Sequence, residues 1–344
     1  MSPSFPSTSP LLDVRNLSIR FKTETGYVNV VHSVSFSVSA GETFCLVGES
    51  GCGKSMSAMA LLGLLPYAGE IASGTVRLEG QELTTMTEKA LCEVRGRRIG
   101  MIFQEPMTSL NPVLRVGDQT AEPLIHHFHM SRKDALEKVK DLFGQVGIPD
   151  PAARLRDFPH QLSGGMRQRV MIAMALACQP ALLLADEPTT ALDVTIQGQI
   201  LSLLRELSES RGMGLLLITH DLGVVAEMAD TVGVMYSGYI VEKGPVAALF
   251  ARPLHPYTQG LMESAPPPAQ IGIQTGSEHE PQPVRQNRLQ AIPGTVPAPH
   301  EMPEGCPFRP RCGKAENRCR ELPPLVQLGE GPVHREVRCW RAAS

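Results

Sequence analysis

A glycine-rich segment between a short apolar stretch and a helix-like stretch constrains the fold more than any other part of this sequence. Residues 43–47 are typical of a buried strand and residues 54–64 of a helix. Gly48, Gly51 and Gly53 allow a tight turn whose backbone N–H groups point inward, beside the positive end of the following helix. The pattern predicts a phosphate-binding loop, formed by Gly48, Glu49, Ser50, Gly51, Cys52, Gly53, Lys54, Ser55 and Met56.

Two side chains of this loop carry nucleotide chemistry, and a second acidic segment complements them. We expect Lys54 to place its ammonium on the β- and γ-phosphates and the Ser55 hydroxyl to ligate Mg²⁺. An apolar strand at residues 181–185 ends in Asp186, suited to hold Mg²⁺, and Glu187, suited to polarise a water. The purely structural alternatives are a glycine-rich turn in place of the phosphate loop and an acidic strand-to-loop corner in place of the Mg²⁺ site. The combination indicates a nucleotide bound together with Mg²⁺.

The surrounding pattern predicts an α/β fold. Residues 11–47 are rich in strand-like alternation, and the apolar strands at 181–185 and 215–219 are separated by helices, which indicates a parallel sheet covered on both faces. Residues 105–162 predict an inserted helical lobe, with a helix at 131–146, and residues 170–177 predict a further helix. After residue 253 the sequence is rich in Pro, Arg and Cys, which predicts an extension with little regular structure.

Composition excludes several classes of function. The chain has 344 residues and a net charge of −3, which argues against nonspecific binding to nucleic acid. It contains no apolar run of the roughly 18 residues that a membrane span requires. Its first residues lack the basic start and apolar centre of a signal peptide, so we expect residues 1–10 to be a disordered tail.

Six motifs, of which the phosphate loop is the first along the chain, resemble those of the ATP-binding cassette (ABC) ATPases. The Leu-Ser-Gly-Gly sequence at 162–165 matches the family signature, and Phe103-Gln104 resembles the glutamine loop. The second Walker motif matches 186–189, the loop after it matches 191–193, and the switch histidine matches 219–221. The resemblance covers about residues 11–250. It implies a P-loop NTPase cassette with a parallel-sheet RecA-like core, an antiparallel β subdomain and a helical subdomain at about 105–165.

The resemblance also implies a role for each matching residue. In this family two cassettes pack head to tail, so each signature closes over the γ-phosphate held by the other chain. Gln104 would contact Mg²⁺ and the attacking water, Glu187 would be the catalytic base, and His220 would hold the γ-phosphate. The facing-subunit contacts would come from the signature residues Ser163, Gly164 and Gly165 and from Asp193. Adenine would stack on Phe21, with Tyr27 as the competing candidate.

Other segments narrow the resemblance to one branch of the family. Residues 104–112, 160–166 and 255–258 resemble the ATPases of dipeptide and oligopeptide importers, a subfamily that includes nickel and glutathione importers. This implies domains at 11–252 and 253–344, and a peripheral position on the cytoplasmic face of the bacterial inner membrane. The implied partners are a second ABC ATPase subunit (identical or homologous), two transmembrane permease subunits and an extracytoplasmic solute-binding protein.

Four cysteines cluster in the C-terminal extension, at Cys306, Cys312, Cys319 and Cys339. Four thiolates can hold a [4Fe–4S] cluster or a tetrahedral zinc, and the spacing lacks the close Cys-x2-Cys pair common at zinc. The subfamily resemblance favours an iron–sulfur cluster with a structural role, because metal coordination can fold a segment of little periodicity. Zinc and unmetallated thiols are the alternatives.

The leading hypothesis is an ATP-hydrolysing subunit that powers import of dipeptides, oligopeptides or related small solutes. A soluble ABC ATPase of DNA repair or translation is the first alternative. However, the segment between phosphate loop and signature shows no heptads, and the chain has one cassette. A redox or sensor protein that uses the cassette as a scaffold for iron–sulfur is the second. The solute itself is not encoded in this chain.

Overall fold

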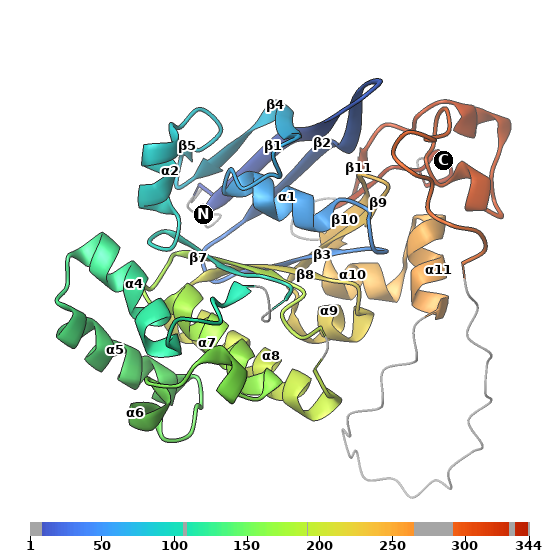
Figure 1. The fold of residues 1–344 in the computed structure, drawn as a ribbon. Coiled ribbons are helices and arrows are strands. Elements are labelled where there is room, and N and C mark those ends of the chain that lie inside the picture. The colour runs from blue at the N-terminus through green and yellow to red at the C-terminus, as the bar shows by residue number, and fades with distance from the viewer. Residues whose placement is uncertain (1–8, 106–108, 191, 265–291, 330–333, 343–344) are drawn as a thin grey trace, which may run out of the picture.

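Two β-sheets and the helices around them make up the fold, which is a computed structural model (Figure 1). The structure describes residues 9–105, 109–190, 192–264, 292–329 and 334–342. Most of the expected N-terminal tail, residues 106–108 of the segment after Gln104, and Ala191 lie outside these ranges.

The larger sheet has the strand order β11-β12-β10-β9-β3-β8-β7-β6. Its centre is parallel, as the continuous apolar runs predict, because such strands are covered on both faces. All residues of β3, β7 and β8 are buried. The strands of this parallel part are β9 (Thr231–Tyr236), β3 (Thr43–Val47), β8 (Gly214–Thr219), β7 (Leu182–Asp186) and β6 (Ile99–Ile102).

The smaller sheet is antiparallel and faces the larger one across helix α1 (Lys54–Leu61) (Figure 1). Leu46, Leu184 and Ile218 of the larger sheet share a core with α1 and strand β1. Helix α1 ends three residues before the sequence predicts, because Gly63 adopts a φ of +62°. The strands of the smaller sheet, in the order β2-β1-β4-β5, are β2 (Gly26–Val38), β1 (Leu12–Thr23), β4 (Gly69–Leu78) and β5 (Gln81–Glu82), and α2 (Glu88–Val94) follows them.

Helices cover the other face of the larger sheet, where Cys45, Ala185 and Leu217 point into a second core (Figure 1). The expected helical lobe lies beside them. Its expected helix is α5 (Arg132–Gln145), begun by Ser131, whose hydroxyl accepts a hydrogen bond from the Asp134 N–H. The helices of this layer and the lobe are α4 (Val116–Phe128), α5, α6 (Pro151–Arg154), α7 (Gly164–Leu176), α8 (Val194–Arg211) and α9 (Leu222–Met228).

The C-terminal extension is largely irregular, as the sequence predicts, but it joins the larger sheet. Antiparallel strand β10 (Tyr239–Pro245) follows β9, and β12 (Arg335–Val337) pairs with β10. At the centre of this junction the Glu242 carboxylate is fully buried and accepts hydrogen bonds from Arg335 and from two backbone N–H groups. The remaining elements are α10 (Val246–Ala251), α11 (Pro256–Ser264), β11 (Val326–Leu328) and the 3₁₀ turns Pro159–Gln161, Arg309–Arg311 and Asn317–Arg320.

The prediction of an iron–sulfur cluster in this extension was wrong. Among the described residues, no group of three or more His, Cys, Asp or Glu side chains is placed to hold a metal ion, which also removes the zinc alternative. Cys306 belongs to the hydrophobic core, and Cys312 and Cys319 pack against that core. Burial raises the pKa of the Cys306 thiol to about 11 and also raises that of Cys312.

The extension stays folded through its contacts with the cassette, which the sequence argument did not foresee. Strand pairing to β10 and the buried ion pair of Glu242 and Arg335 supply the order that we attributed to a metal. The redox or sensor hypothesis loses its cofactor for the same reason. Cys306, Cys312, Cys319 and Cys339 are all free thiols.

We predict that His255, at the start of the extension, makes stability depend on pH. Its Nδ1 accepts a hydrogen bond from the Tyr257 N–H at 3.0 Å, and burial lowers its pKa to about 3. The unfolded chain therefore takes up a proton below pH 6.5 that the folded chain does not, and stability falls as the pH falls through that value. Between pH 6.5 and 5 this one group should cost about 2 kcal/mol.

Urea unfolding of the full chain at several pH values measures this effect. His255→Asn keeps an acceptor for the Tyr257 N–H but cannot titrate, so its stability should fall about 2 kcal/mol less over the same interval. Parallel pH profiles for the two proteins would contradict the assignment. His300→Asn is the control, since His300 is an exposed histidine of the same extension.

Candidate functional site

The phosphate loop lies between β3 and α1, and the surrounding backbone fixes its shape. Gly51 and Gly53 adopt φ values of +77° and +102°, which favour glycine. A Cβ on Gly48 would lie 2.1 Å from the carbonyl oxygen of Met235, so only glycine fits there. The loop is therefore held as a tight turn at the carboxyl end of a parallel strand.

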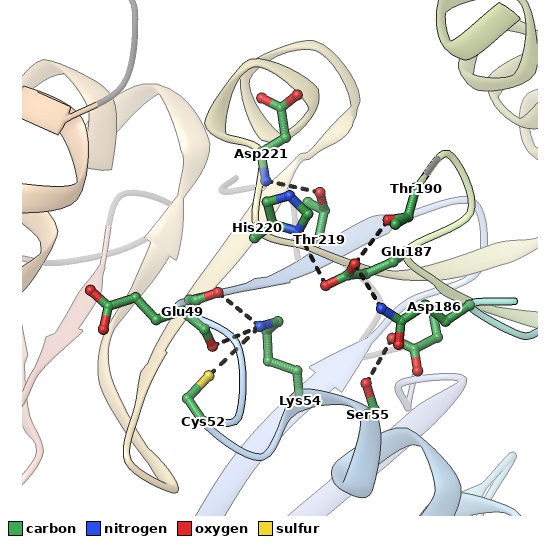
Figure 2. A network of polar contacts seen from close by, with 12 residues as sticks. Glu49, Cys52, Lys54, Ser55, Asp186, Glu187, Thr190, Thr219, His220 and Asp221 are labelled. Atoms are coloured by element: carbon green, nitrogen blue, oxygen red, sulfur yellow. Dashed lines mark hydrogen bonds and ion pairs between the residues drawn. The ribbon is translucent and has the colours of Figure 1, made fainter. Parts of the chain in front are cut away.

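Lys54 occupies the concave side of this loop (Figure 2). Its ammonium donates to the carbonyl oxygens of Gly48 at 2.8 Å and of Glu49 at 3.0 Å, and its side chain is buried. This holds a cation where the loop's N–H groups converge, as phosphate binding requires. The neighbouring Cys52 is buried and burial raises the pKa of its thiol. Ser50 and Gly51 are exposed, and Met56 packs against the core between the sheets.

Asp186 ends strand β7 directly beside the loop. The Ser55 hydroxyl donates to its Oδ1 at 3.0 Å, and the carboxylate is 2% exposed. Burial raises the pKa of Asp186, although the Ser55 hydrogen bond opposes this. A buried carboxylate and a hydroxyl at this separation offer hard oxygen donors for a divalent cation, so these residues fit the Mg²⁺ that the sequence predicts.

Glu187 is the centre of a polar cluster that joins three further segments (Figure 2). Its carboxylate accepts from Gln104 Nε2 at 3.1 Å and from the Thr190 hydroxyl at 2.9 Å, and it lies 3.2 Å from His220 Nδ1. The residue adopts a φ of +46°, a strained conformation of the kind that persists at functional sites. The structure thus brings together Gln104, Glu187 and His220.

The cluster keeps Glu187 ionised. Burial alone would raise the pKa of Glu187, but hydrogen bonds from Thr190 and His220 outweigh it and lower the pKa. An ionised carboxylate at neutral pH can accept a proton from a water. The arrangement therefore provides a base beside a phosphate loop, which is what hydrolysis of a nucleoside triphosphate requires.

The signature residues lie apart from this cluster, at the start of α7. The Ser163 hydroxyl caps that helix by accepting from the Met166 N–H at 3.3 Å. Ser163 and Gly164 are exposed, and no atom lies within 4 Å of a Cβ placed on Gly164. Asp193 caps α8 by accepting from the Ile196 N–H at 2.9 Å, so its carboxylate has a structural partner within this chain.

The two candidates for adenine stacking lie on the hairpin of β1 and β2. The Phe21 ring packs over Gly69 of the adjacent strand β4 and is partly exposed. Tyr27 is 53% exposed, and the Arg20 guanidinium lies 4.1 Å from the centre of its ring. Both rings remain available to a base, and the choice of Phe21 stays a prediction.

Sequence reasoning missed two sets of residues at this site. The first is Thr190, which donates a hydrogen bond to Glu187. Its position directly after the second Walker motif could have indicated this contact. The side chains of Tyr257 and Arg311 both contact Glu49, from more than two hundred residues away in the chain. Tyr257 lies in the segment 255–258 that resembles importer ATPases, but the sequence around Tyr257 or Arg311 does not indicate a contact with Glu49.

This site and its two-sheet scaffold define an ATP-binding cassette. The family model described as "ABC transporter" matches residues 31–190. Among solved structures, the post-hydrolysis dimer of the ATP-binding cassette MJ0796 with ADP and Pi is similar, with a TM-score of 0.62 and 26% identity. That similarity covers 68% of this chain and 98% of that one.

Full-length relatives identify the branch. The oligopeptide transport ATP-binding protein AppD of Bacillus subtilis is 47% identical, over 96% of this chain and 97% of its own. The dipeptide transport ATP-binding protein DppD of Escherichia coli is 47% identical, over 96% of both chains. A second family model, for the C-terminal region of oligopeptide/dipeptide transporters, matches residues 241–277 and 275–319. The chain belongs to the ABC transporter ATP-binding proteins of this branch, and its site is that of an ATPase.

We predict that Glu187→Gln lowers kcat for ATP hydrolysis by about 100-fold or more while MgATP still binds. An amide fits the same space but cannot accept the proton of the attacking water. Phosphate release and equilibrium binding of MgATP measure the two effects. Glu206→Gln, the same change at an exposed position of α8, is the control and should hydrolyse ATP normally. Unimpaired hydrolysis by Glu187→Gln would exclude Glu187 as the base.

Proposed function

We propose that this chain is the ATP-hydrolysing subunit of an importer for dipeptides or oligopeptides in the bacterial cytoplasmic membrane. The cluster in which Gln104, Thr190 and His220 surround the ionised Glu187 carries the proposal, because it provides a general base for hydrolysis beside the phosphate loop. Similarity to AppD and DppD along nearly the whole chain supports peptides as the solute class. We assign residues 11–252 to the cassette and 253–344 to the extension.

Each residue of the site has a role in this proposal. Lys54 and the loop N–H groups bind the phosphates, and Phe21 stacks on adenine. Mg²⁺, held by Ser55, Asp186 and Gln104, would neutralise charge on the phosphate oxygens. Glu187 takes a proton from the water that attacks the γ-phosphorus, while the bond from that phosphorus to the ADP oxygen breaks. His220 orients Glu187 and the γ-phosphate, and the products are ADP and phosphate.

The proposal extends to the assembly around this subunit. None of the helices in the described ranges is both long and apolar enough to cross a membrane. We propose that the chain binds peripherally to two permease subunits on the cytoplasmic face, and that an extracytoplasmic binding protein captures the solute. A second cassette, identical or homologous, would receive the exposed Ser163 and Gly164 and the partly buried Gly165 over its γ-phosphate, and would contact Asp193.

Reconstitution into proteoliposomes tests the proposal. The full chain, assembled with two permeases, a second cassette and the binding protein, should accumulate labelled di- or oligopeptides when ATP is supplied on the cassette side. Glu187→Gln should abolish this uptake, since turnover drives transport, and Glu206→Gln should retain it. Uptake is measured as trapped label against time.

Three outcomes would contradict the proposal. Affinity purification from membranes that recovers no polytopic subunit would remove the importer and favour a soluble ABC ATPase. Uptake of nickel or of glutathione in place of peptides would move the chain to another member of the branch. Uptake that does not depend on ATP would show that ATP hydrolysis by this chain does not power transport.

A further inference from the structure

The side chain of Glu49, in the phosphate loop, points away from Lys54 (Figure 2). Its carbonyl oxygen accepts from Lys54 on the inner side of the loop. Its backbone N–H donates to the Tyr257 hydroxyl at 2.9 Å, and its carboxylate accepts from both terminal nitrogens of Arg311 at 2.7 and 3.1 Å. The outer side of the loop is therefore bound to two residues of the C-terminal extension, Tyr257 and Arg311.

Arg311 is built into this position rather than resting on the surface. Its side chain is 6% exposed, and its Nε donates to the carbonyl of Pro293 at 2.9 Å. Burial by itself would lower the pKa of Arg311, but hydrogen bonds to Glu49 and Tyr236 raise it above its ordinary value. A forked guanidinium that meets both carboxylate oxygens fixes direction as well as distance.

The aromatic rings behind the loop fix Tyr257 and Arg311 in turn. The Tyr257 ring centre lies 4.6 Å from that of Tyr236 and 5.4 Å from that of Phe308. Phe308 also packs edge-on against Tyr236. Tyr236 comes from β9 of the cassette, whereas Tyr257 and Phe308 come from the extension. Both the cassette and the extension thus contribute rings to the aromatic cluster that packs behind the phosphate loop.

We propose that Arg311 is a positioning residue for nucleotide binding, which holds the phosphate loop in its binding shape through Glu49. The loop is held independently on its other side, where the Cys52 carbonyl accepts from the Gly238 N–H at 2.9 Å. Anchoring the Glu49 side completes this support, so that the N–H groups converge before the phosphates arrive. The C-terminal extension is then part of the ATP site, in addition to any contact with partner subunits.

The physical basis is preorganisation. A loop that is already ordered loses less conformational freedom when it closes around an anion, and binding is tighter by that amount. Without Arg311 the loop must become ordered during binding, and the partly buried Glu49 carboxylate is left without its cation. Both effects weaken nucleotide binding, and neither alters Glu187, so kcat should be preserved.

Binding of MgADP to the isolated full chain measures the effect, because ADP engages the phosphate loop without transport or hydrolysis. Arg311→Met keeps the apolar stem but removes the fork, and it should raise the Kd for MgADP about tenfold, equivalent to about 1.4 kcal/mol. In the assembled transporter the KM for ATP should rise to a similar extent, with kcat within about twofold of the original. An unchanged Kd in a folded Arg311→Met protein would overturn the proposal.

Arg341→Met is the matched control, because Arg341 forms an exposed ion pair with Glu316 in the same extension. It should bind MgADP normally, and an equal loss of affinity in this variant would show a general effect of the extension and contradict the proposal.

Glu49→Gln should weaken MgADP binding as Arg311→Met does, and the double variant should bind MgADP no more weakly than either single variant. Additive losses would show that the two residues act separately. If Arg311→Met does not fold, Glu49→Gln decides, and an unchanged Kd for MgADP then contradicts the proposal.

Discussion

The convergence of parallel strand ends at one edge of the larger sheet is the constraint on which the rest of this molecule depends. Strands β3, β8, β7 and β6 are neighbours in that order. The phosphate loop follows β3, His220 follows β8, Asp186 ends β7 and Gln104 follows β6. Because adjacent parallel strands end at the same edge, four segments far apart in sequence deliver their polar side chains to one place. The apolar strands are buried on both faces, which makes this edge rigid.

This constraint explains why most of the cassette could be predicted from sequence. The parallel strands are continuous apolar runs, and the motifs sit at their ends, so pattern and chemistry point to the same fold. Helix boundaries were less certain for local reasons. Gly63 ends α1 early, and Ser163 starts α7 before the apolar run that indicates it. Such capping geometry depends on single residues rather than on periodicity.

The extension could not be predicted to the same depth, and the error there has a physical cause. Strands β11 and β12 have three residues each, too few to show alternation, and β10, the partner that ties β12 to the sheet, lies about ninety residues earlier. Four cysteines in a segment of little periodicity indicated a metal, since spacing says nothing about burial. The structure places Cys306 in an apolar core and stabilises the segment with Glu242 and Arg335 instead.

The phosphate loop then depends on residues from the whole length of the chain. Its inner side meets Lys54 within the loop, and its outer side meets Tyr257 and Arg311. The signature residue Ser163 is exposed at the start of α7, and in the proposed assembly it would serve the site of a second cassette. A nucleotide would thus be enclosed from the front by another subunit while the loop beneath it is braced from behind by the extension. In this arrangement Glu49 links the extension directly to the backbone that would bind the phosphates.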